Sequence, residues 1–297
     1  MIIKLSGGSI KGAFQAGALA EMVKNENIKP RRIEGISVGS LNTLFLLDSI
    51  GRQDSLEKEE KQFRIAVNEL ETLWIENITK PSDLIKKRNL ISILMDYIKG
   101  DFKGLLSNKP LENLVKKHIQ LTDTNQYLVN IPTSIAGRFG ICDLEKGKIV
   151  YRHAENKNVL DSVMASSAIP FIFPPHKFND SIYYDGGMID VTPTCIPKEE
   201  SRVVIIAPHP RLRSETKLLH KNKVKPVDLA QRVMEVIVGE TIRNDIENTK
   251  QYCIENNIQL DIIRPEKEID IKISEFDNNA TKWMVSLGRH YAKRLYK

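Results

Sequence analysis

The segment Gly35-Ile36-Ser37-Val38-Gly39 has the spacing at which a serine can act as a nucleophile. An apolar, strand-like run precedes it and a helical pattern follows it. Such a turn holds the serine backbone in a strained conformation that lifts the hydroxyl above a sheet, and bulky flanking residues would collide with neighbouring elements. The first amides of the following helix would point at the group that the hydroxyl attacks. The sequence therefore predicts a nucleophile elbow at Ser37, flanked by Gly35 and Gly39.

A second glycine-rich segment is suited to stabilising negative charge. It follows a short apolar run, opens a helical pattern and consists of Gly7, Gly8, Ser9, Ile10, Lys11 and Gly12. Attack on a carbonyl creates an oxyanion, which needs N–H donors, and we interpret this segment as their source. A phosphate-binding loop is the weaker alternative. Its P-loop form requires Lys and then Ser or Thr where Ala13 and Phe14 stand, and its dinucleotide form requires glycine at Ser9.

The general base is expected to be an aspartate. The histidines are His118, His153, His176, His209, His220 and His290. His209 follows a predicted strand but lies between two prolines, so it remains a minor alternative. Asp185 ends a predicted strand and is followed by Gly186 and Gly187, which would expose its carboxylate at the sheet edge where Ser37 emerges. We therefore favour Asp185.

The composition is that of a folded globular chain. Of the 297 residues, 41% are hydrophobic and 28% are charged, which argues against a disordered, collagen-like or coiled-coil protein. Charges interrupt every apolar run before it reaches the length of about 18 residues that a membrane span needs, and the first residues lack the pattern of a secretory signal. The net charge of +6 is compatible with anionic membranes or nucleic acid but requires neither. We expect a cytoplasmic protein, with peripheral membrane contact as an open alternative and no nucleic-acid partner.

The cysteines predict neither disulfides nor a metal site. Cys142, Cys195 and Cys253 are odd in number and far apart, which suits a reducing compartment. We interpret them as small buried apolar residues. No cofactor or metal is expected.

Alternating strand and helix patterns predict a single α/β domain over residues 1–297. Its fold class is a three-layer α/β/α sandwich with a mainly parallel central sheet. Strands are expected at 2–5, 33–36, 127–135, 137–143, 147–153, 182–184, 203–207 and 258–263. Helices are expected at 12–25, 38–50, 163–168, 226–256 and 277–296, the last two forming a C-terminal helical extension. A helical insertion over about 51–109 should pack beside the sheet.

Four blocks in the order of one known family occur between residues 7 and 187. They are Gly7-Gly8-x-x-Lys11-Gly12, Gly35-x-Ser37-x-Gly39-Ser40-Leu41-Asn42, Ala165-Ser166-Ser167-Ala168-Ile169-Pro170 with Phe173-x-Pro175, and Asp185-Gly186-Gly187. With these blocks the chain resembles the patatin-like phospholipases. Two departures are Ser9, where the family has a third glycine, and Met188 to Pro193, where the family often has an asparagine before the proline.

The resemblance implies lipid acyl hydrolysis, a phospholipase A-type cleavage of carboxylic esters, by a Ser–Asp dyad without histidine. It implies that Ser37 is the nucleophile, that Asp185 is the base and that amides around Gly8, Ser9 and Ile10 form the oxyanion hole. Lys11 stands where the family has Arg or Lys. A phospholipid or another lipid ester is the implied substrate.

Two segments could bring the protein to lipid. The basic residues between Pro208 and Lys225 would meet anionic headgroups, or simply form a solvated loop. The insertion residues Trp74 and Ile91–Tyr97 would line an acyl groove or cover it, although core packing explains them equally well.

Two rival functions remain open at this stage. One is a catalytically silent patatin-fold protein that binds lipid or a partner, and the intact Ser37 and Asp185 favour an enzyme over it. The other is nucleotide binding at the glycine segment.

Overall fold

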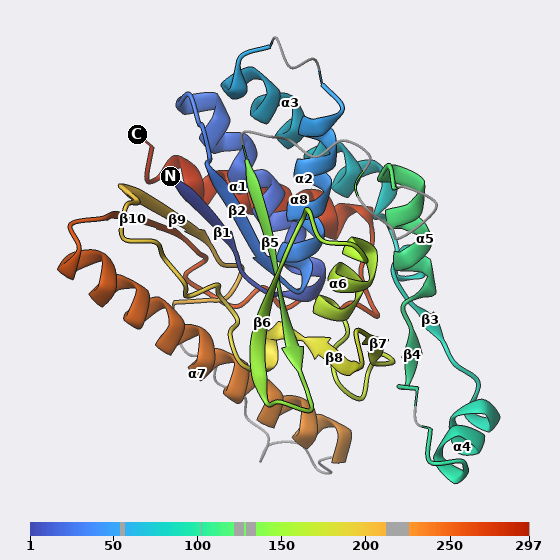
Figure 1. Cartoon of the computed structure of the whole chain (residues 1–297). Helices are drawn as coiled ribbons and strands as arrows, with labels where there is room; N and C mark the ends of the chain where they lie inside the picture. Colours follow the sequence, from blue (N-terminus) through green and yellow to red (C-terminus); the bar gives the residue numbers. More distant parts are fainter. Residues whose placement is uncertain (54–56, 102, 122–127, 129–134, 212–225, 297) are drawn as a thin grey trace.

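The computed structural model describes residues 1–53, 57–101, 103–121, 128, 135–211 and 226–296. A mixed sheet forms its middle layer (Figure 1), in the order β10-β9-β1-β2-β5-β8-β7 with β6 paired to β5. The strands are β1 (Ile2–Leu5), β2 (Arg32–Ile36), β5 (Ala136–Asp143), β6 (Lys148–His153), β7 (His176–Phe178), β8 (Ser181–Asp185), β9 (Arg202–Ile206) and β10 (Gln259–Ile263). The run β10-β9-β1-β2-β5 is parallel, whereas β6, β7 and β8 pair antiparallel.

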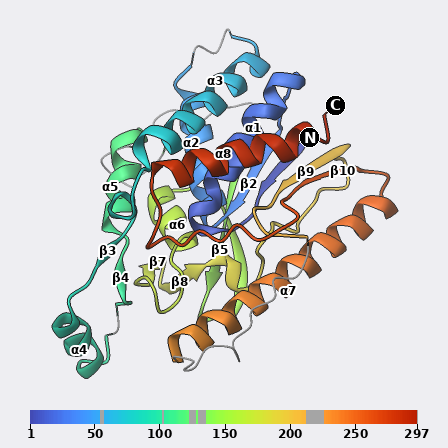
Figure 2. The ribbon, with the colours of Figure 1, turned by 180° about the vertical axis from the view of Figure 1, so that it is seen from behind.

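Helices cover both faces of this sheet (Figures 1 and 2). They are α1 (Gly12–Asn25), α2 (Val38–Gly51), α3 (Glu59–Thr72), α6 (Val159–Ser166), α7 (Pro226–Glu255) and α8 (Asn278–Lys293). Because side chains alternate along a strand, β9 contributes to two cores. Val204 and Ile206 join the core beneath α1 and α8, whereas Val203 and Ile205 pack against α7 on the opposite face. The predicted three-layer α/β/α arrangement is confirmed.

The insertion after α2 differs from the expectation in one respect. α3, a π-helical turn (Leu73–Asn77), a 3-10 turn (Pro81–Asp83) and α5 (Lys109–His118) lie against the body, and Trp74 is a core residue with 1% of its surface exposed. Between them, β3 (Lys86–Lys87) and β4 (Leu106–Ser107) form an arm that carries α4 (Leu90–Ile98) away from the body. The expected packing of α4 beside the sheet is therefore wrong. Apolar spacing predicted the helix, but it does not specify what covers the apolar face.

Three smaller expectations can be compared with the structure. All three cysteines are free, and Cys142 and Cys253 are buried as expected, but Cys195 is exposed. Its carbonyl is the buried part, because that oxygen accepts a hydrogen bond of 2.8 Å from Lys4 Nζ. The expected strand at 127–135 and the basic residues at 212–225 lie outside the described residues, apart from residues 128 and 135. Among the described helices, none is both long and apolar enough to cross a membrane.

Candidate active site

Ser37 occupies a sharp turn between β2 and α2. Its φ of 55° and ψ of −126° are strained for a residue with a side chain. A Cβ atom at Gly35 would lie 2.2 Å from the carbonyl oxygen of Gly39, and a Cβ atom at Gly39 would lie 2.0 Å from the carbonyl oxygen of Leu5. The two glycines of the motif are therefore required by direct backbone contacts around the turn.

Asp185 ends β8 and lies beside the serine. The Ser37 hydroxyl hydrogen-bonds its carboxylate, and Gly187 N–H donates to Asp185 Oδ1 at 2.8 Å. Burial nevertheless raises the pKa of Asp185 to about 7, because both hydrogen bonds only partly offset the loss of hydration. The expected exposed carboxylate is wrong, since Asp185 is only 6% exposed. Asp185 is the last residue of β8 and pairs with Ile141 of β5, next to Gly140, which pairs with Ile36 just before Ser37.

The glycine segment lies directly beside Ser37. A methyl group at Gly7 would lie only 3.3 Å from Ser37 Cβ. Within the described residues, the backbone N–H groups of Gly8, Ser9 and Ile10 have no hydrogen-bond acceptor. Ser9 has a φ of 54°, so the position where the family has glycine adopts a conformation that glycine tolerates best.

The other three amides of this segment are already engaged. Gly7 N–H donates to the carbonyl of Val191 at 2.9 Å, and Lys11 N–H donates to the carbonyl of Gly8 at 3.1 Å. Gly12 N–H donates to carbonyls within the same turn. The segment therefore offers a set of three free donors, which is smaller than the six residues that the sequence indicated.

Ser166 forms hydrogen bonds to both Ser37 and strand β5. Its hydroxyl oxygen accepts the Ser37 N–H at 2.9 Å, and its hydroxyl donates to the carbonyl of Gly140 at 2.6 Å. Two residues later, the carbonyl of Ala168 accepts the Asp185 N–H at 3.0 Å. One short segment thus fixes the backbone of both Ser37 and Asp185. The sequence showed this block but gave no role for it; a hydroxyl in an otherwise small, apolar helix was the available signal.

A buried chain of amides holds the glycine segment in place. Trp74 Nε1 donates to Asn42 Oδ1 at 2.9 Å, and Asn42 Nδ2 donates to Gln15 Oε1 at 2.9 Å and to the carbonyl of Gly12 at 3.1 Å. Gln15 Nε2 in turn donates to the carbonyl of Ser6 at 2.7 Å. Because all these groups are buried and paired, they fix α1 and α2 relative to the glycine segment.

His209 lies close to the site but is held neutral. Its Nε2 is 3.0 Å from the carbonyl oxygen of Gly7, to which it must donate. Burial, together with the positive charge of the nearby Lys11, lowers the pKa of His209 to about 3. In the part of the chain that is described, no hydrogen bond joins His209 to Ser37 or Asp185. The ammonium of Lys11 forms a 2.7 Å ion pair with Glu268.

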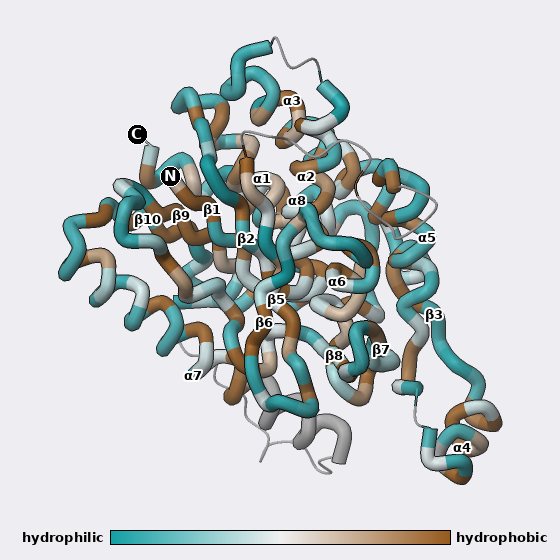
Figure 3. The backbone as a smooth tube through the Cα atoms, viewed as in Figure 1, coloured by the Kyte–Doolittle hydropathy of each residue, from teal (hydrophilic) through white to brown (hydrophobic). Residues whose placement is uncertain are grey.

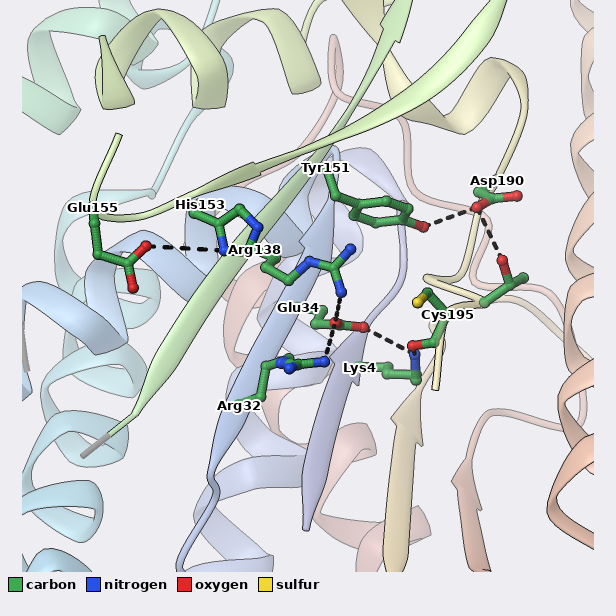
Figure 4. Close-up of polar contacts among 10 residues, drawn as sticks. Lys4, Arg32, Glu34, Arg138, Tyr151, His153, Glu155, Asp190 and Cys195 are labelled. Atoms are coloured by element: carbon green, nitrogen blue, oxygen red, sulfur yellow. Dashed lines mark hydrogen bonds and ion pairs between the residues drawn. The ribbon is translucent and has the colours of Figure 1, made fainter. Parts of the chain in front are cut away.

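A separate group of buried charges lies across β1, β2 and β5, the sheet-face cluster (Figure 4). Lys4 Nζ is 2.9 Å from Glu34 Oε2, and Arg138 Nη1 is 2.9 Å from Glu34 Oε1. Burial lowers the pKa of Lys4 against the opposing effect of Glu34. Beside them, the Tyr151 hydroxyl donates to Asp190 at 2.8 Å.

This cluster positions the segment that follows Asp185. Lys4 donates a hydrogen bond to the carbonyl of Cys195, and the Asp190 carboxylate accepts one from the Tyr151 hydroxyl. From α7, Asp245 accepts the N–H groups of Val191 and Thr192 at 2.8 and 3.0 Å. The segment is thereby tied both to the sheet and to α7. Within the described ranges, no group of three or more His, Cys, Asp and Glu side chains is arranged to hold a metal ion.

Two known proteins are similar to this chain. A "Probable lipid hydrolase 463L" of Invertebrate iridescent virus 6 is 29% identical in an alignment of 205 positions that covers 62% of this chain and 58% of that protein. The crystal structure of VipD from Legionella pneumophila aligns with a TM-score of 0.46 and 15% identity, covering 99% of this chain and 66% of that one. The chain thus spans less than two thirds of either relative.

The family assignment rests on a match to a family model over more than half of the chain. The model of the patatin-like phospholipases, "Patatin", matches residues 4–196. This range contains the glycine segment, the elbow at Ser37, the segment around Ser166 and the Asp185-Gly-Gly turn. The chain belongs to the patatin-like phospholipase family.

Proposed function

We propose that the protein is a lipid acyl hydrolase in which Ser37 is the nucleophile and Asp185 the general base. The observation that carries this proposal is the contact between the Ser37 hydroxyl and a buried carboxylate whose pKa is raised to about 7. A base with a pKa near the working pH is strong enough to accept a proton and is still ionised in a large fraction of molecules. An ordinary aspartate, with a pKa near 3.9, is a much weaker base.

The first half of the reaction forms an acyl-enzyme. The Asp185 carboxylate takes the Ser37 proton as Oγ attacks the ester carbonyl, and the oxygen of that carbonyl becomes an oxyanion. The free N–H groups of Gly8, Ser9 and Ile10 donate to it. The bond between the former carbonyl carbon and the alkoxy oxygen then breaks, the C=O bond reforms, and the proton on Asp185 passes to the departing alcohol.

The second half regenerates the serine. Asp185 takes a proton from a water molecule, which attacks the acyl carbonyl, and the same N–H donors stabilise the new oxyanion. When the bond to Oγ breaks, the proton returns to Ser37 and a fatty acid leaves. The same carboxylate thus acts as base and then acid in each half, so this mechanism needs no histidine.

The lipid nature of the substrate is supported by family membership and by the name of the viral relative. Phospholipid is the substrate class that the name of the family implies.

The direct test is release of fatty acid from vesicles of mixed phospholipids, measured by mass spectrometry. Wild-type protein should release fatty acid, and Ser37→Ala should lose about 10⁴-fold or more of the rate. Ser286→Ala is a suitable control, because Ser286 is an exposed residue of α8 and should leave the rate unchanged. Equal release by Ser37→Ala would refute the assignment, and a wild type inactive on both vesicles and soluble esters would support a silent binding protein.

A further inference from the structure

The arm formed by residues 86–107 exposes an apolar stripe that no other part of the described structure covers. Five α4 residues spaced i, i+1, i+4, i+5 and i+8 share one side of the helix. Their exposed fractions are 83% for Leu90, 70% for Ile91, 58% for Leu94, 49% for Met95 and 73% for Ile98. Figure 3 shows this hydrophobic helix at the far end of the arm. An exposed contiguous apolar surface of this kind marks a contact with a partner or a membrane.

The arm has a defined conformation. Its strands pair with Lys86 opposite Ser107 and Lys87 opposite Leu106. Arg88 donates to the carbonyl of Gly104 at 2.8 Å and forms an ion pair with Asp96, on the side of α4 away from the stripe. The exposed apolar side is therefore held outward by contacts on the other side.

The base of the arm is attached to the segment that supports the active site. Leu105 N–H donates to the carbonyl of Phe171 at 3.0 Å, and Leu106 N–H donates to the carbonyl of Ile172 at 2.8 Å. This segment directly follows Ser166 and Ala168, which bond the backbones of the proposed dyad. Phe171 is itself 72% exposed and Leu105 44%. Exposed apolar side chains therefore occur at both the far end of the arm and its base, where the arm joins the segment that supports the proposed dyad.

Unpaired positive charge flanks the stripe. Lys86 and Lys87 precede it and Lys99 follows it; all three are exposed, and none forms an ion pair among the described residues. The two acids of the arm are already neutralised, Asp96 by Arg88 and Asp101 by Lys103. A short amphipathic helix with basic flanks fits the interfacial region of an anionic bilayer, where the apolar side enters the acyl boundary and the lysines meet lipid phosphates.

We propose that the arm is a membrane-docking element that inserts the apolar side of α4 into the surface of an anionic phospholipid bilayer. The three free lysines favour this occupant over a second copy of the chain, since a symmetric pairing of two arms would bring like charges together. The biological meaning of this docking rests on the proposed function, because it would hold the dyad at the surface that contains its substrate. Binding itself does not depend on catalysis.

The test is flotation of the full chain with vesicles of equal parts phosphatidylglycerol and phosphatidylcholine, in the Ser37→Ala background so that lipid is not consumed. Ile91→Glu with Leu94→Glu should weaken partitioning into vesicles at least about tenfold, since charges then replace two aliphatic side chains that enter the bilayer in the proposed docking. Ile254→Glu is the matched control, because Ile254 is 72% exposed near the far end of α7, and it should bind as the parent does. Lys86→Glu with Lys87→Glu should weaken binding to these vesicles and not to pure phosphatidylcholine.

Hydrolysis of a soluble short-chain ester separates this inference from the proposed function. With Ser37 restored, the Ile91→Glu, Leu94→Glu variant should keep its rate on the soluble ester and lose rate on vesicles. Equal flotation of this variant and its parent would overturn the docking role while leaving the hydrolase intact. Loss of a dimer in light scattering, with flotation unchanged, would instead identify a second copy as the occupant and also overturn the proposal.

Discussion

Two groups of buried charged side chains lie in one sheet, and they differ in whether each charge has an oppositely charged partner. In the sheet-face cluster, Lys4 and Arg138 both contact Glu34, so each buried charge faces an opposite one. In the active site, Asp185 is equally buried but its side-chain partners are the hydroxyl of Ser37 and one amide of the backbone. In the first group each charge has an opposite partner, whereas the second has a carboxylate without a counter-charge among the described residues.

The difference separates a structural role from a chemical one. A buried carboxylate beside a cation is held ionised and is a poor proton acceptor. A buried carboxylate without a cation has its pKa raised, which makes it a base but makes its ionised form unstable in the fold. The cluster around Glu34 holds the segment that follows Asp185, whereas the proposed role of Asp185 as base would come at the cost of stability.

The largest expected effect concerns Asp185, the buried carboxylate without a counter-charge. Asp185→Asn should lower kcat/KM for ester hydrolysis by about 10³- to 10⁴-fold, because the amide hydrogen-bonds Ser37 but cannot accept its proton. In the wild type, kcat/KM should rise with pH until about 7, the pKa of Asp185, and then level off. A pH–rate profile of wild-type protein and an active-site titration of the variant check both statements. A profile that is already flat at pH 5 would contradict the assignment of Asp185 as the base.

In the sheet-face cluster, where the charges are paired, a substitution is expected to lower stability. Glu34→Leu leaves Lys4 and Arg138 without their shared partner and should lower the free energy of unfolding by about 3–5 kcal/mol. Lys4→Met should cost less, because Glu34 keeps Arg138. Urea unfolding of the two variants measures this order, and similar losses in both would show that the cluster is not organised around Glu34.

The buried carboxylate of Asp185 also predicts that stability depends on pH. Asp185 has a folded-state pKa of about 7, above its unfolded value near 3.9, so the unfolded chain loses this proton first as pH rises. Its contribution to stability is therefore present below pH 4 and is lost between about pH 4 and 7, by roughly 4 kcal/mol at most. Asp185→Asn should remove this loss and be more stable than wild type at pH 8. Asp245, whose pKa burial raises to about 6, behaves likewise in both proteins and cancels in the difference.

The sequence alone predicted the parts of this comparison that depend on local pattern. Strand, glycine turn and helix are encoded within residues 1–50, and the elbow at Ser37 follows from the local pattern of Gly35, Ser37 and Gly39. The strand end at Asp185 and the two glycines after it pointed to this residue, and the family resemblance implied its role as base. Its carboxylate was expected to be exposed, and the burial involves contacts with segments distant in sequence, such as the pairing of Asp185 with Ile141 of β5.

Other features could not be predicted from the sequence, because they depend on residues that are far apart in the chain. Ser166 contacts Ser37 across 129 positions of the chain, and Lys4 contacts the carbonyl of Cys195 across 191. The exposure of α4 was missed because an amphipathic pattern looks the same whether its apolar side meets a core or a membrane. Pairings of this range are set by the whole fold, so only the structure reveals them.

The smallest expected effect concerns a third kind of buried group. His209 is buried near the site like Asp185, but it is neutral, with its pKa lowered to about 3, and its Nε2 bonds the carbonyl of Gly7. His209→Gln preserves a donor for that carbonyl and should keep kcat/KM within about tenfold of wild type, the size expected for one imperfect neutral hydrogen bond. Steady-state kinetics on a soluble ester, with circular dichroism as the check on folding, measure this. A loss of about 10²-fold or more in a folded variant would mean that the imidazole takes part in proton transfer and that the comparison must include a triad.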